Sequence, residues 1–137
     1  MTAEEILTSK KRYAIIGASN DPEKYGYELV DVLHKSGYTV YPINPKYEFI
    51  DTIPCYHTIK ELPLPPEVII VALAPINSER VVNNLKIENG QTVWLPPNCF
   101  TDEAISICHR NNYSVVYDVC PIGTLRKMAS QHSRKEG

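Results

Sequence analysis

The 137-residue sequence lacks several features that would direct it to particular classes of function. Its longest apolar run, from Val68 to Ala74, falls far short of the ~20 residues that cross a bilayer, so we expect no membrane partner. The acidic start, Met1 to Glu5, contains no apolar core of a signal peptide. No basic stripe stands out in a chain of net charge −2, which argues against nucleic acid as the main partner.

Metal-binding and redox motifs are also missing. The four cysteines, Cys55, Cys99, Cys108 and Cys120, are widely spaced and form no Cys-x-x-Cys. Neither a zinc site nor a thioredoxin-type motif is therefore indicated. The four histidines are scattered without the spacing of metal ligands. Reduced thiols in a cytoplasmic protein are the expected state, with Cys120 favoured as a structural residue over a disulfide partner of a ligand thiol.

What the sequence does contain is a regular alternation of short apolar and amphipathic segments. Strands are predicted over residues 12–17, 39–43, 68–73, 92–95 and 114–117. Helices are predicted over 25–36, after Ala74-Pro75 and ending at Asn89-Gly90, after the N-cap residue Thr101, and from near Thr124. Prolines make residues 47–66 irregular, apart from one helical turn at 59–62.

This alternation predicts the fold class. Successive βαβ crossovers give a three-layer, Rossmann-like α/β fold, with a mainly parallel five-stranded sheet and helices on both faces. Without repeats or a linker, residues 1–137 suit a single domain. Residues 1–11 and 125–137 are expected to be loose ends, with a short helix as the alternative for residues 1–11.

The first strand leads into the small-residue turn Gly17-Ala18-Ser19, and a helix follows at Tyr25. Free amides and the positive end of the helix dipole make such a turn an anion site. Ligands of these sheets bind at the carboxyl ends of the strands, beside the first strand. The loops at 17–24, 44–46 and 74–78 should meet there. Replacing Gly17 with valine is expected to abolish nucleotide binding and leave the fold largely intact.

The loop sequences narrow the class of ligand. The first loop has neither Gly-x-Gly-x-x-Gly nor a Gly-Lys-Ser/Thr motif, which disfavours plain NAD binding and hydrolysis of ATP or GTP. The second strand ends in Asn44-Pro45-Lys46, without the acidic residue that holds a ribose diol. A lysine there suits a phosphorylated ribose, as in NADP and coenzyme A. Lys24 adds charge near a pyrophosphate, and Pro75 is placed to pack against an adenine or a pantetheine arm.

An ordered set of short motifs runs from Tyr13 to Cys120. It comprises Ile16-Gly17-Ala18-Ser19 with Pro22 and Lys24, Gly37-Tyr38-x-Val40-x-Pro42-x-Asn44-Pro45, Ile59-x-x-Leu62-Pro63, Val93-Trp94-Leu95-Pro96, Glu103-Ala104 and Val115-Val116-Tyr117-Asp118-x-Cys120. With these motifs the sequence resembles the small stand-alone CoA-binding domain proteins, which are Rossmann-like and related to the CoA-binding domain of the succinyl-CoA ligase α subunit.

The resemblance implies binding of coenzyme A or an acyl-CoA through the first loop, the Asn-Pro turn and the loop after the third strand. The expected ligand contacts are Gly17, Ala18, Ser19, Asn20, Lys24, Tyr25, Asn44, Pro45, Lys46, Ala74 and Pro75. The chain departs from the family pattern around the rim of this site, at Asp51-Thr52, Pro96, Asn98-Cys99-Phe100 and Val119.

Three functions remain open from the sequence. A non-catalytic CoA-binding module is favoured, because no nucleophile–base pair or second domain is evident, although catalysis is left undecided. An NADP-binding reductase or nicotinamide sensor is the alternative that Lys46 and the fold permit. A regulatory interaction domain with a degenerate pocket is the alternative that the rim departures favour. A homodimer through helix faces is compatible with each.

Overall fold

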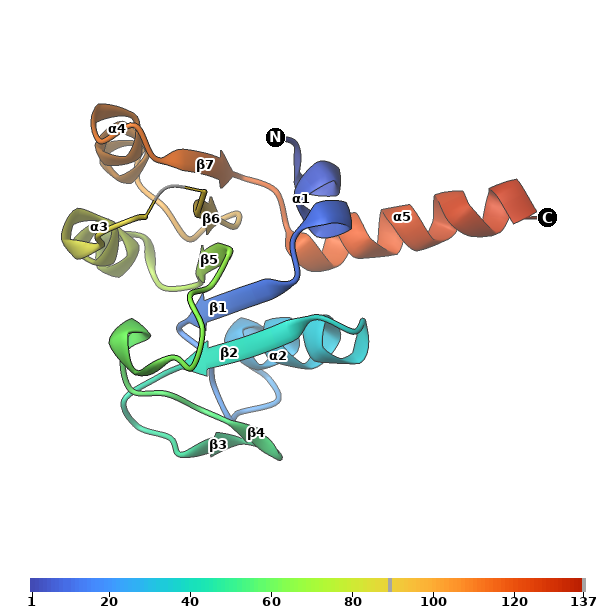
Figure 1. Ribbon diagram of the computed structural model, residues 1–137, viewed down its shortest axis with the longest axis horizontal. Coiled ribbons are helices and arrows are strands. Elements are labelled where there is room, and N and C mark those ends of the chain that lie inside the picture. The colour runs from blue at the N-terminus through green and yellow to red at the C-terminus, as the bar shows by residue number, and fades with distance from the viewer. Residues whose placement is uncertain (89, 137) are drawn as a thin grey trace.

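A five-stranded parallel sheet forms the centre of the computed structural model, which describes residues 1–88 and 90–136 (Figure 1). The strands are β1 (Arg12–Ile16), β2 (Thr39–Ile43), β5 (Val68–Val71), β6 (Thr92–Leu95) and β7 (Ser114–Tyr117), in the order β2-β1-β5-β6-β7. The predicted fold class is confirmed. The second, fourth and fifth predicted strands have the predicted bounds, and the first and third are slightly shorter.

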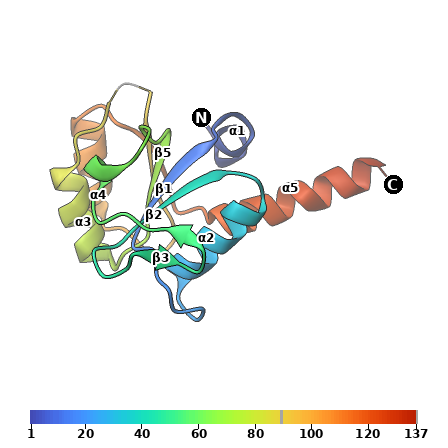
Figure 2. The same ribbon diagram turned by 60° about the horizontal axis from the view of Figure 1, so that its bottom comes forward.

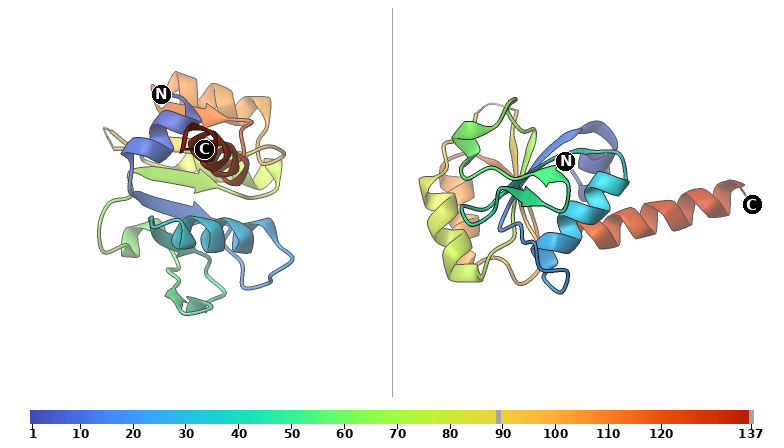
Figure 3. Two further views of the ribbon diagram at one scale, coloured as in Figure 1. Left: turned by 90° about the vertical axis from the view of Figure 1, so that its right-hand side faces the viewer. Right: turned by 90° about the horizontal axis from the view of Figure 1, so that it is seen from below.

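Helices cover both faces of this sheet. The helices α1 (Ala3–Ser9), α2 (Tyr25–Lys35) and α5 (Pro121–Glu136) lie on one face, and α3 (Pro75–Asn84) and α4 (Asp102–Arg110) lie on the other (Figures 2 and 3). Alternate strand residues divide between the two cores, as the pleat requires. Tyr13 and Trp94 are buried on the α2 side, whereas Ala14 and Leu95 are buried on the α3 side.

The direction of the chain connections reverses between β1 and β5. The chain leaves β1 into α2 on one face and leaves β5 into α3 on the other, so the two connections separate at the carboxyl ends of adjacent strands. This is the switch point at which parallel sheets bind ligands. The sequence placed the candidate site here.

The structure corrects one predicted loop and the end of one predicted helix. Residues 47–66 contain a hairpin of β3 (Phe49–Ile50) and β4 (Ile53–Pro54), besides the predicted turn of helix at η1 (Ile59–Glu61). Asp51 closes the hairpin with a φ of 52°, and an edge strand tolerates Pro54. α3 ends at Asn84, not at Asn89-Gly90, because Leu85 is extended. Asn89 lies outside the described residues.

Helices form at both ends of the described chain: α1 lies within residues 1–11 and α5 continues to Glu136. Gly137 lies outside the described residues. A reciprocal capping box between Thr2 and Glu5 starts α1. Ile6 is fully buried, and its carbonyl accepts a hydrogen bond from the Tyr13 hydroxyl at 3.1 Å. α5 begins at Pro121, packs beside α1 and α2, and then runs outwards (Figure 1). None of the helices formed by the described residues is long and apolar enough to span a membrane.

We expect Ile6→Ala to lower the free energy of unfolding by about 2–4 kcal/mol, because it removes a fully buried side chain of the core. Urea denaturation followed by circular dichroism measures this change. Thr8→Ala, on the exposed side of the same helix, is the matched control and should change stability by under about 1 kcal/mol. Equal, small effects of both substitutions would show that α1 does not pack on the domain.

Candidate functional site

The bend after β1 is held by close backbone contacts around Gly17. Gly17 has a φ of +95°, and its amide donates to the carbonyl of Ile43 at 3.2 Å. A Cβ atom added to Gly17 would lie 2.4 Å from the carbonyl oxygen of Ala72 and 2.8 Å from Cδ2 of Leu73. The expectation that Gly17→Val leaves the fold intact is therefore wrong, because a larger residue must displace the end of β5 as well as strain the bend.

A second glycine holds the bend from the other side. A Cβ atom on Gly26, in the first turn of α2, would lie 2.0 Å from the carbonyl oxygen of Gly17 and 3.2 Å from Cα of Ala18. The helix start and the bend are therefore in backbone contact, which only glycine permits. Sequence reasoning gave Gly26 no role. Its position one residue inside the predicted helix, after a glycine turn, was the available signal.

The bend presents unpaired amides. Within the described ranges 1–88 and 90–136, the amides of Ala18, Ser19 and Asn20 have no hydrogen-bond partner. The polar side chains of this loop do not accept hydrogen bonds from these three amides. Ser19 Oγ accepts from the amide of Asp21 at 3.0 Å, and Asn20 Oδ1 accepts from the amide of Asp51 at 3.2 Å. Lys24 is the N-cap residue of α2 and provides no side-chain cap. Consecutive free amides beside a helix N-terminus suit an anion.

Asn44 joins the second loop to the bend. Its Nδ2 donates to the carbonyl of Ala18 at 2.8 Å, and its Oδ1 accepts from the amide of Lys46 at 2.9 Å. Both ends of the amide side chain are thus used to position backbone. Pro45 and Lys46 follow on the surface, with their side chains exposed. This arrangement leaves Asn44 as a positioning residue and Lys46 as the accessible charge.

The third loop lies against the same bend. Ala72 and Leu73 contact the position of Gly17, and the fully buried Ser78 donates from Oγ to the carbonyl of Leu73 at 3.2 Å. Ala74 is the N-cap residue of α3 and Pro75 its first residue, and both are exposed. The structure therefore brings the three predicted loops together at the carboxyl ends of β1, β2 and β5.

Tyr25 is the predicted site residue that points elsewhere. Its hydroxyl lies 3.0 Å from Sγ of Cys120, on the α2 side of the sheet. Burial first, and then the hydrogen bond to Cys120, raise the pKa of Tyr25. With Pro97, Asn98, Cys99 and Cys120, it lines a pocket of about 380 Å³ at the carboxyl ends of β6 and β7.

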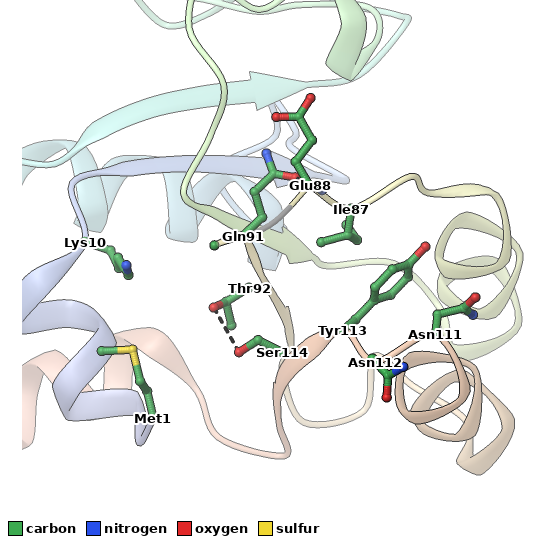
Figure 4. Close-up of a pocket in the computed structure, with 11 residues that line it drawn as sticks. Met1, Lys10, Ile87, Glu88, Gln91, Thr92, Asn111, Asn112, Tyr113 and Ser114 are labelled. Carbon is green, nitrogen blue, oxygen red and sulfur yellow. Dashed lines mark hydrogen bonds between the residues drawn. The ribbon is translucent and has the colours of Figure 1, made fainter.

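Among the larger hollows of the described residues, two lie away from this thiol-lined pocket at opposite edges of the sheet. One, of about 500 Å³, lies on the α3 side of the carboxyl edge and is lined by Ile16, Ile43 and Arg80 among others. The other, of about 450 Å³, lies where β6 and β7 begin (Figure 4). Its walls are largely polar, and Thr92 Oγ1 donates to Ser114 Oγ at 3.2 Å across its floor. Because it opens at the amino ends of the strands, it is not part of the three-loop site.

The hairpin supplies contacts that sequence reasoning missed. The Tyr27 hydroxyl donates to Asp51 Oδ2, while the Asp51 amide donates to Asn20. These bonds tie the β3–β4 turn to the first loop. Asp51 adopts a left-handed backbone conformation with a φ of 52°, which aspartate tolerates better than most residues other than glycine.

Comparison with known proteins shows the family of this chain. A family model described as a CoA binding domain matches residues 11–125. The uncharacterized protein YneT of Bacillus subtilis is 21% identical over 117 residues, which are 85% of this chain and 87% of YneT. The α subunit of ADP-forming acetate–CoA ligase II from Pyrococcus furiosus is 35% identical over 79 residues. That match covers 57% of this chain and 16% of the ligase subunit.

Solved structures of similar proteins share the fold of this chain. A hypothetical protein from Pyrococcus horikoshii superimposes with a TM-score of 0.83 at 29% identity, over 91% of this chain and 88% of that one. A conserved hypothetical protein from Pyrococcus furiosus gives a TM-score of 0.72 at 26% identity, over 82% and 97% of the two chains. These neighbours are small proteins of about the same extent as this chain.

Proposed function

Because the chain belongs to the CoA-binding domain family, we propose that it binds coenzyme A or an acyl-CoA through the loops that follow β1, β2 and β5. Family membership supports CoA binding as such. The assignment to these loops rests chiefly on the amides of Ala18, Ser19 and Asn20, which donate to no acceptor among the described residues and lie in the loop that leads into α2. In this proposal they receive the pyrophosphate of the ligand.

The surrounding groups match the remaining parts of the ligand. Lys46, exposed next to the Asn44 turn, is placed to meet the phosphate on the CoA ribose, and Lys24 adds charge beside the pyrophosphate. The hollow of about 500 Å³ beside Ile16 and Ile43 offers apolar space for a flat base. Pro75 is exposed at the start of α3, and in this proposal it contacts the adenine or the pantetheine arm.

We propose a non-catalytic role for this three-loop site. In the described residues of the loops 17–24, 44–46 and 72–78, no nucleophile is paired with a general base. The hydroxyl of Ser78 is buried and donates to a carbonyl of its own loop. The ligase activity named for the Pyrococcus furiosus subunit is not carried over, because the matched segment is a small part of that protein. Cytoplasmic location and homodimer formation remain predictions.

An NADP-binding reductase or sensor is the second candidate, favoured by the same lysine at the end of β2. CoA and NADP share a phosphorylated ribose joined to adenine and a pyrophosphate. They differ beyond the pyrophosphate, where CoA carries a flexible pantetheine arm and NADP carries a nicotinamide ribose. A degenerate, empty pocket is the third candidate, and it predicts that neither ligand binds.

We expect isothermal titration calorimetry to show saturable binding of CoA or acetyl-CoA at micromolar to low millimolar concentration, with NADP and NADPH weaker by about tenfold or more. The titrations should be run with a reducing agent, so that only reversible binding is measured. Equal or tighter binding of NADPH would favour the reductase. The absence of heat with every CoA species at millimolar concentration would overturn CoA binding.

A further inference from the structure

Two cysteines and a tyrosine share the pocket of about 380 Å³ at the carboxyl ends of β6 and β7. These strands are neighbours, with Leu95 opposite Tyr117 at the end of their ladder. Cys99 follows β6 in a turn closed by its own amide, which donates to the carbonyl of Pro96 at 3.1 Å. Cys120 follows β7, and the indole of Trp94 donates to the preceding carbonyl, that of Val119, at 2.8 Å. The two thiols therefore lie in the same pocket because they follow neighbouring strands.

These two thiols differ from the other pair in the chain. Cys108 is fully buried, and burial raises its pKa to about 11. Cys55 is buried beside β2, where its thiol faces the carbonyl oxygen of Asn44. Cys120 is only partly buried and is the thiol in hydrogen-bond contact with Tyr25. Cys99 is 7% exposed, and burial, followed by the neighbouring Cys120, raises its pKa.

The pocket lies next to the proposed CoA site. Tyr25, which lines it, is the first residue of α2 and follows directly on the loop that carries the unpaired amides of Ala18 to Asn20. The sulfur of CoA is at the far end of the pantetheine arm, so a ligand held by its pyrophosphate at the bend can carry a sulfur towards this pocket. The pocket surface is mainly apolar, which suits the pantetheine chain.

We propose that this pocket is a dithiol site that reacts with disulfides of CoA. The proposal rests on the function proposed above, because the three loops supply the affinity for CoA. In the first step the thiolate of Cys120 attacks a sulfur of the CoA disulfide. The S–S bond of the disulfide breaks, one CoA leaves as a thiolate, and a Cys120–CoA mixed disulfide forms.

In the second step the thiolate of Cys99 attacks Sγ of Cys120 in the mixed disulfide. A Cys99–Cys120 disulfide forms and the second CoA leaves as a thiolate. Overall, two protein thiols are oxidised, one CoA disulfide is reduced to two CoA thiols, and no other oxidant takes part. This step requires the two Cβ atoms to reach a separation of about 4 Å, so it also tests the placement of Cys99.

The order of attack follows from accessibility. Cys120 is the more exposed thiol, so an incoming disulfide reaches it first. Cys99 is more deeply buried and forms a thiolate less readily, but a thiol of raised pKa is intrinsically a stronger nucleophile once ionised. Substitution of Cys99 should therefore trap the mixed disulfide, whereas substitution of Cys120 should prevent both steps.

The test is intact-mass spectrometry of the reduced, desalted full chain after incubation with CoA disulfide and acid quenching. We expect the wild type to lose two hydrogen atoms and release two CoA thiols per chain. We expect Cys99→Ser to retain one covalently bound CoA and Cys120→Ser to keep its original mass. Glutathione disulfide should react more slowly by about tenfold, because it lacks the groups that raise the effective concentration at the pocket.

Several results would overturn the dithiol site: an unmodified wild type, a mixed disulfide that persists on the wild type, the same modification in Cys120→Ser, or an equal rate with glutathione disulfide. Calorimetry of the wild type with CoA under reducing conditions separates this failure from that of the proposed function. Reversible CoA binding without exchange removes only the dithiol site. Absence of CoA binding removes the proposed function as well.

Discussion

Replacing Gly26 with alanine is expected to lower the free energy of unfolding by about 3 kcal/mol and to abolish CoA binding. The added Cβ would lie 2.0 Å from the carbonyl oxygen of Gly17, and both atoms belong to backbone that cannot turn away as a side chain can. Either α2 or the bend must move. Movement of the bend displaces the amides of Ala18 to Asn20, so stability and ligand affinity should fall together.

The matched control for this change is Gly123→Ala. Gly123 also lies in the first turn of a helix, α5, and its added Cβ would meet no atom closer than Cys120 Cβ, at 3.8 Å. This substitution should leave stability unchanged or raise it by up to about 1 kcal/mol, because alanine loses less backbone entropy on folding. Chemical denaturation and CoA calorimetry measure both variants. Similar behaviour of the two would show that Gly26 is not needed for close packing.

Reversing the charge of Lys46 should weaken CoA binding by about tenfold or more while leaving the fold unchanged. The Lys46 side chain is exposed, and the turn around it is held by the backbone amide of Lys46 and the side chain of Asn44, both of which Lys46→Glu retains. A glutamate would repel the phosphate on the CoA ribose. A tenfold loss corresponds to about 1.4 kcal/mol of binding free energy.

Lys127→Glu, on an exposed position of α5, makes the same change in net charge away from the three loops and is the control. It should alter CoA affinity by less than about twofold at physiological salt, where distant surface charges are screened. Dephospho-CoA sharpens the test. If Lys46 meets the ribose phosphate, Lys46→Glu should weaken CoA far more than dephospho-CoA. An equal loss for both ligands would place Lys46 elsewhere, and no loss would remove it from the site.

The strands and the meeting of the three loops could be predicted because they depend on local patterns. Val68 to Val71 is apolar at every position, as a strand covered on both faces is, and a small-residue turn at Gly17 signals a βα connection. The resulting alternation leaves few topologies. The carboxyl ends of parallel strands then lie at one edge whatever the details of packing.

The remaining features depend on contacts between segments far apart in the chain. Ile6 is buried because α5 packs beside α1 and Tyr13 of β1 bonds to it. Neither contact can be predicted from the short, polar segment around Ile6 in the sequence. Tyr25 follows the loop in sequence, yet its side chain turns to Cys120, which is 95 positions away. The tie between Asp51 and Asn20 likewise joins two turns whose proximity no local pattern indicates.

The most direct test of the central claim is a crystal structure of the protein with bound CoA. Our account predicts pyrophosphate oxygens within hydrogen-bond distance, about 2.7–3.2 Å, of the amides of Ala18, Ser19 and Asn20, with the phosphorylated ribose towards Lys46. A CoA molecule bound with these amides empty, for example in the polar pocket of Figure 4 at the opposite edge of the sheet, would contradict it.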